Sequence, residues 1–166
     1  MTILGLSVPA FTALHVIISL IGIGAGIVVL IAMAANNSLK GWTALFLLTT
    51  ALTSITGFFF HSVAFGPPHI FGIVTLVMFI PILVGLYGKH LSGWWRLIYI
   101  VGAAFVLWLN AVVGVIQFFQ KVSFLNPLAP TQTEPPFLVA QAILLVVIVV
   151  LALVAAVRFR PAPDSA

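Results

Sequence analysis

Five long apolar runs, separated by short polar or proline-rich segments, occupy most of the chain and limit what it can fold into. A helix needs about 20 apolar residues to cross the roughly 30 Å hydrocarbon core of a bilayer. With 63% hydrophobic and 5% charged residues, no soluble fold would keep this much apolar surface out of water. We therefore predict an all-α membrane protein, a polytopic helix bundle in a single domain covering residues 1–166. Its five transmembrane helices are expected at 9–35, 43–61, 69–87, 97–119 and 136–157, with Pro81 kinking the third.

The positions of the six cations predict how the bundle is oriented. Five spans place alternate loops on opposite sides of the membrane, and cytoplasmic loops carry an excess of Lys and Arg. One side has only Lys121, whereas the other has Lys40, Lys89, Arg96, Arg158 and Arg160. This split predicts an exoplasmic N-terminus and a cytoplasmic C-terminus.

The composition excludes several classes of function. Without cysteine, the chain forms no disulfide and no thiolate site for zinc or an iron–sulfur cluster. Six scattered cations are too few for a nucleic-acid surface, so the lipid bilayer is the expected partner, with other membrane proteins or a second copy of the chain as further options. The sequence also contains no hydrolase motif, paired carboxylates or phosphate-binding loop. We expect no catalytic residue and favour a non-enzymatic protein over an enzyme.

Polar residues within three of the runs recur at helical spacing. Such residues are costly in lipid and usually face the protein interior. The stripes are His15, Ser19, Gly22 and Gly26 in the first run; Thr50, Ser54, Gly57 and His61 in the second; and Asn110, Gly114, Gln117 and Lys121 in the fourth. The two glycines of the first stripe would let a neighbouring helix approach closely. Thr and Ser in such helices also often hydrogen-bond their own backbone, and Asn110 and Gln117 are equally compatible with hydrogen bonds between helices.

Most of these polar residues lie in the exoplasmic half, whereas the cytoplasmic half of the bundle is comparatively plain. The sequence therefore predicts a polar cavity open to the exoplasmic side, covered by the loop that carries Glu134. Glu134 and Lys121 are expected either to form a local ion pair or to be two solvated loop charges. The expected ligand-binding residues are His15, Ser19, His69, Asn110, Gln117, Lys121, Glu134 and Gln141. On this interpretation the protein is a small membrane protein that binds a ligand or serves as an accessory subunit.

Three histidines give an alternative interpretation. His15, His61 and His69 come from successive runs near the exoplasmic side, and imidazole binds haem iron, copper or zinc. A haem b or a metal ion held by them would make the protein a redox subunit. Their depths differ, because His15 is six residues into its run, about 9 Å along a helix, while the other two flank a turn. Hydrogen bonding to a ligand or proton, or a plain interfacial position, therefore stays open.

Three stretches resemble a group of small multi-pass proteins of the bacterial inner membrane. They are 11–23 (FTALHVIISLIGI), 41–57 (GWTALFLLTTALTSITG) and 128–137 (LAPTQTEPPF). The resemblance covers about a quarter of the chain and implies the same location for this protein. It implies no activity and no functional residue.

Overall fold

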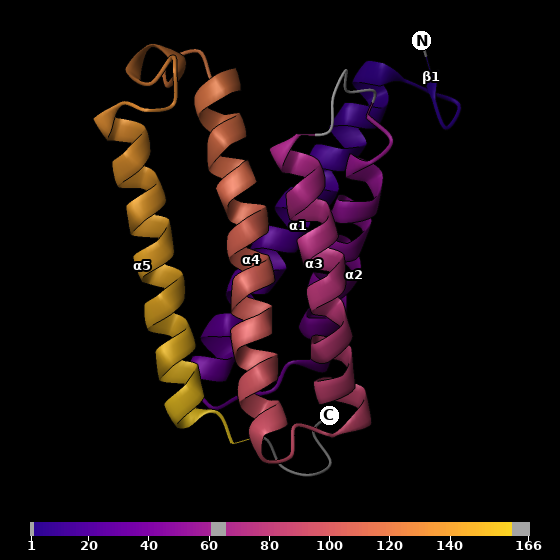
Figure 1. Ribbon diagram of the computed structural model, residues 1–166, viewed down its shortest axis with the longest axis vertical. Helices are drawn as coiled ribbons and strands as arrows, with labels where there is room; N and C mark the ends of the chain where they lie inside the picture. The colour runs from indigo at the N-terminus through magenta and orange to yellow at the C-terminus, as the bar shows by residue number, and fades with distance from the viewer. Residues whose placement is uncertain (1, 61–65, 161–166) are drawn as a thin grey trace.

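The computed structural model of the protein describes residues 2–60 and 66–160, except for the side chains of Pro67 and Pro68. Within these residues the chain is almost entirely helical, as predicted, and contains five α-helices that run alternately up and down (Figure 1). They are α1 (Val8–Ala34), α2 (Lys40–Gly57), α3 (Pro67–Leu83), α4 (Trp94–Lys121) and α5 (Pro135–Arg158). The shorter elements are the antiparallel pair β1 (Thr2–Ile3) and β2 (Leu6–Ser7), the π-helix η1 (Val84–Gly88) and the 3₁₀-helix η2 (Asn126–Leu128).

Proline accounts for several helix boundaries and for one irregularity. α3 and α5 each begin at proline, whose fixed φ suits the first turn and whose missing N–H is not needed there. Pro81 lies inside α3, where it cannot donate a backbone hydrogen bond. The helix then loosens into η1, in which the Lys89 N–H donates to the Val84 carbonyl at 2.8 Å. The predicted disturbance at Pro81 is thus followed by a π-helical turn.

Four helical segments of the described chain are long and apolar enough to cross a membrane. They are α1, residues His69–Gly88 of α3 and η1, α4 and α5. The exception is α2, an 18-residue helix with a lower mean hydropathy because it contains five threonines and a serine. These four candidate spans are consistent with a multi-pass membrane protein.

α4 lies centrally in the bundle, whereas α5 forms one edge (Figure 1). α1 packs most extensively on α2 and crosses α4 at Gly26. A Cβ atom added to Gly26 would lie 2.7 Å from Leu107 Cδ1 of α4 and 2.7 Å from Phe46 Cε2 of α2. The expected close approach of neighbouring helices at the α1 glycines is confirmed, since three helices meet at this residue.

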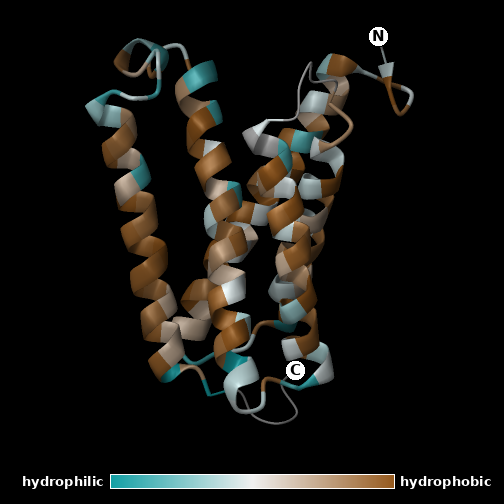
Figure 2. Ribbon diagram, viewed as in Figure 1, coloured by the Kyte–Doolittle hydropathy of each residue, from teal (hydrophilic) through white to brown (hydrophobic). Residues whose placement is uncertain are grey.

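The alternation of the helices produces two distinct ends. The C-terminal ends of α1, α3 and α5 meet the N-terminal ends of α2 and α4 at one end, which we call the basic end (Figure 1). It contains Lys40, Lys89, Arg96, Arg158 and Arg160. The other end, which we call the Glu134 end, also contains Lys121. Hydrophilic residues concentrate at both ends, and the helices between them are mainly hydrophobic (Figure 2).

Candidate ligand-binding site

Polar side chains of α1 and α2 face one another along the Glu134 half of the bundle. His15 Nδ1 lies 2.8 Å from Thr56 Oγ1, and the Ser19 hydroxyl donates to Thr53 Oγ1 at 3.3 Å. Because the two helices are antiparallel, residues 15 and 19 of α1 meet residues 56 and 53 of α2. We call these four side chains the polar seam. The sequence predicts His15 and Ser19 as ligand-binding residues, and both belong to the polar seam.

The hydroxyls of the seam are already bonded to their own helices. Thr56 donates to the Leu52 carbonyl at 2.7 Å, and Thr53 donates to the Thr49 carbonyl at 2.9 Å. When the Thr56 hydrogen is used in this way, His15 Nδ1 carries the hydrogen that joins the two side chains. This leaves Nε2 of His15 as a lone-pair acceptor.

A second polar group, which we call the central cluster, lies deeper and joins α1, α2 and α4. It consists of Gly22, Thr49, Thr50 and Asn110. A Cβ atom placed on Gly22 would lie 3.1 Å from Thr49 Oγ1 and 3.3 Å from both Thr50 Oγ1 and Asn110 Nδ2. Three polar atoms thus converge on the bare backbone of one glycine.

Two polar atoms of the central cluster lack partners. The Thr49 hydroxyl donates to the Leu45 carbonyl at 2.7 Å, but Thr50 Oγ1 and Asn110 Nδ2 have no hydrogen-bond partner among the described residues. Thr50 is only 1% exposed. Buried polar groups in native proteins are nearly always bonded, and an orphan costs about 1–3 kcal/mol. Since all four residues are uncharged, the cluster suits a neutral molecule that can accept a hydrogen bond from Asn110 and pair with a hydroxyl.

The loop before α5 is organised by Glu134. Its Oε1 accepts from the Thr131 N–H at 3.1 Å and from the Thr131 hydroxyl at 2.8 Å, while Oε2 accepts from the Thr133 N–H at 3.0 Å. Desolvation raises the pKa of Glu134, but these hydrogen bonds outweigh it and hold the pKa below its usual value. The expected ion pair with Lys121 is wrong, because within the described chain the carboxylate accepts its hydrogen bonds from these two threonines.

The remaining predicted residues of α4 and α5 are dispersed. Gln141 donates through Nε2 to the Val112 carbonyl at 3.3 Å and so joins α5 to α4. Its Oε1 is buried without a partner among the described residues. Gln117 is half-buried, and Lys121 is exposed at the end of α4. Of the predicted α4 stripe, Asn110 and Gly114 contact α1, since a Cβ atom on Gly114 would lie 3.2 Å from Ile23.

The predicted histidine ligands that the structure describes, His15 and His69, have different partners. The His15 ring meets Phe60 edge-on with centroids 5.1 Å apart. The His69 ring lies 5.9 Å from that of Phe58, and its Nδ1 accepts from the Gly66 N–H at 3.2 Å. His61 lies outside the described residues. Within the described ranges, no three His, Cys, Asp or Glu side chains gather in a way that would hold a metal ion.

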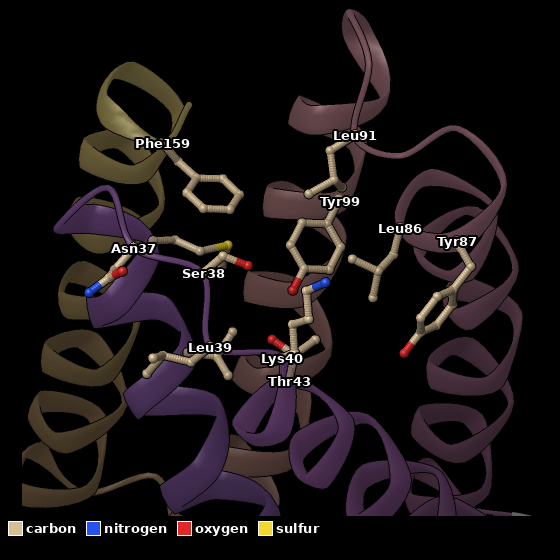
Figure 3. A pocket seen from close by; sticks show the side chains of 12 residues that line it. Asn37, Ser38, Leu39, Lys40, Thr43, Leu86, Tyr87, Leu91, Tyr99 and Phe159 are labelled. Carbon is tan, nitrogen blue, oxygen red and sulfur yellow. The ribbon is translucent and has the colours of Figure 1, made fainter. Parts of the chain in front are cut away.

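The structure also contains a cavity that the sequence did not predict. It occupies about 150 Å³ at the basic end, and Figure 3 shows its lining side chains. The polar ones are Asn37, Ser38, Lys40, Thr43, Tyr87 and Tyr99. The expectation of a plain half at this end is therefore wrong. The polar groups come from three separate elements and the loop between α1 and α2, so no single helix shows them as a stripe.

No protein-family model, curated protein or solved structure matches the chain. The resemblance to small bacterial inner-membrane proteins stays a prediction.

Proposed function

We propose that the protein binds a small, uncharged polar molecule in the central cluster and has no enzymatic activity. We place it in a bacterial inner membrane with five spans, an exoplasmic N-terminus and a cytoplasmic C-terminus. The polar seam lies on the exoplasmic side of the central cluster in this orientation, so the ligand enters from that side.

One observation carries this proposal: the convergence of two orphan polar atoms on Gly22. An Asn amide and a Thr hydroxyl lie within 3.3 Å of a common point, and both are buried without a partner in the described chain. A structural role would have paired them, as it pairs Thr49, Thr53 and Thr56 with carbonyls of α2. Their unused hydrogen-bonding capacity supports a bound molecule.

The packing of α2 supports its role as a fifth span. Its threonines donate to carbonyls four residues earlier, which reduces the cost of their hydroxyls in lipid. At about 1.5 Å per residue an 18-residue helix is about 27 Å long, close to the hydrocarbon thickness. It also packs against both α1 and α3, which qualify as spans themselves. The five cations of the basic end support a cytoplasmic position for that end.

Native mass spectrometry of protein purified in a mild detergent tests the binding proposal. We expect wild-type protein to carry a small-molecule adduct that Asn110→Leu and Thr50→Val both lose. Ser54→Ala is the matched control, because the Ser54 hydroxyl already donates to the Thr50 carbonyl at 3.0 Å. It should retain the adduct. Wild-type protein without any adduct, or variants that keep it, would count against the proposal.

A haem or metal site at His15 is the second candidate. The hydrogen bond from Nδ1 to Thr56 leaves Nε2 with its lone pair, which is the arrangement that second-shell partners give to metal-binding histidines. An absorption spectrum and a metal analysis of the purified protein decide between the candidates. A Soret band or bound metal that His15→Ala removes would establish this site, whereas a colourless, metal-free protein would exclude it.

A further inference from the structure

The cavity at the basic end contains hydrogen-bond donors that the central cluster does not use. We propose that it binds a phosphate group, either in the headgroup of an anionic lipid or as free phosphate. This site lies at the opposite end from the polar seam. It is therefore distinct from the site of the proposed function.

Two buried hydroxyls line the cavity. Tyr99 is 2% exposed and Thr43 is 8% exposed, and their side chains form a hydrogen bond with each other. Two hydroxyls joined by one bond use one of their two hydrogens, so the other can be donated to a ligand. Figure 3 shows the Tyr99 hydroxyl pointing toward Lys40 and Thr43. A ligand that enters the cavity thus meets a hydroxyl donor and an ammonium group together.

The surrounding charge favours an anion. Lys40 is exposed at the cavity, and four further cations lie at the same end of the bundle. Of the two acidic side chains, Glu134 lies at the other end, and Asp164 falls outside the described residues. Lys40 is also the first residue of α2, whose N-cap Leu39 provides no side-chain acceptor, so the positive end of the helix dipole adds to the attraction.

The size and depth of the cavity suit a phosphate. A water molecule takes up about 30 Å³ in the liquid, so a cavity of about 150 Å³ is large enough for a phosphate group. Trp42 and Trp94 are 46% and 79% exposed at this end, and exposed tryptophan marks the headgroup region of a membrane. Basic pockets between helices at this depth bind phosphorylated lipid headgroups.

The experiment compares two sources of phosphate with the same set of variants. Binding of phosphatidylglycerol is measured by native mass spectrometry, and inorganic phosphate is titrated against tryptophan fluorescence, with the full chain in a zwitterionic detergent that contains no phosphate. We expect Lys40→Gln and Tyr99→Phe each to weaken binding by about tenfold or more, as expected when a hydrogen bond to a charged group is lost. Lys89→Gln removes the same charge at the same end but does not line the cavity, and should change binding by less than about twofold, as for a screened surface charge.

Each outcome decides the proposal. Loss of binding in the two cavity variants, with either probe, supports the proposal. Binding of phosphatidylglycerol alone identifies a lipid headgroup as the ligand, and binding of inorganic phosphate identifies the free ion. Equal weakening in all three variants would show only diffuse attraction to the basic end and overturn it. Absence of binding by both probes would also overturn it. Circular dichroism checks folding, and Lys40→Gln carries the test if Tyr99→Phe unfolds. Failure here leaves the proposed function intact, because Asn110 is not involved.

Discussion

Replacement of Thr50 by valine tests whether the central cluster is built for a ligand. Valine has nearly the shape of threonine but lacks the hydroxyl, which in Thr50 is buried without a partner among the described residues. Removing an orphan that costs about 1–3 kcal/mol should stabilise the empty protein by about 1–2 kcal/mol. For a chain of 166 residues this corresponds to a rise in Tm of about 2–8 °C.

The bound ligand should reverse the sign of this effect. At a ligand concentration of about 100 Kd, binding adds about 2.7 kcal/mol to the wild type, and the valine variant should forfeit most of it. The assay is thermal unfolding in detergent, followed by circular dichroism, before and after extensive washing to remove small molecules. Ser54→Ala is the matched control, because the Ser54 hydroxyl lies outside the central cluster and donates to the Thr50 carbonyl at 3.0 Å, and washing should not change its Tm relative to wild type. If Thr50→Val lowers the Tm of washed protein, the hydroxyl has a protein partner and our reasoning fails.

Three further predictions concern the frame around the site. Gly26→Ala should lower the free energy of unfolding by about 1–3 kcal/mol, because the added Cβ would overpack against Leu107 and Phe46. Gly24→Ala is the control and should be neutral or stabilising, because no atom lies within 4 Å of its added Cβ. Equal stabilities of the two variants would refute the close packing. Arg96→Gln should lower stability by about 1–2 kcal/mol, since the guanidinium donates to the Ala156 and Phe159 carbonyls at 2.8 Å, and an unchanged Tm would show that these bonds contribute nothing. The pKa of Glu134 is lower in the folded protein than its ordinary value of 4.5, so its contribution to loop order is fully present above pH 4.5. This contribution is lost as the pH falls through the folded pKa. Hydrogen exchange of the loop amides checks this, and protection that stays unchanged as Glu134 is protonated would contradict it.

The sequence was sufficient to predict the helices and the faces on which they meet. Apolar runs and their flanking prolines give five helices whose ends agree with the structure to within a few residues. The stripe residues from His15 to Gly26 share one face as expected, because helical periodicity determines which residues share a face, and in the structure this face meets α2. The same periodicity gives no pairing between helices. It therefore could not show that Asn110 would meet Gly22, or that Gln117 would lie apart from both.

The features that could not be predicted depend on residues far apart in the sequence, or on which of several nearby groups pairs with a given side chain. The cavity at the basic end combines Lys40 and Thr43 with Tyr99 of α4, and a single tyrosine in an apolar helix has no periodic signal. The expected ion pair of Glu134 was wrong because nearby Thr131 provides donors at a lower entropic cost than a long lysine side chain. Both cases require knowledge of contacts that composition and spacing do not contain.

The most direct test of a ligand in the central cluster is an experimental structure of protein purified from its membrane, at a resolution that shows ordered waters. Our account predicts density for a non-protein molecule within hydrogen-bond distance of both Thr50 Oγ1 and Asn110 Nδ2. Asn110 bonded to another protein group, or a single ordered water that satisfies both atoms, would contradict it.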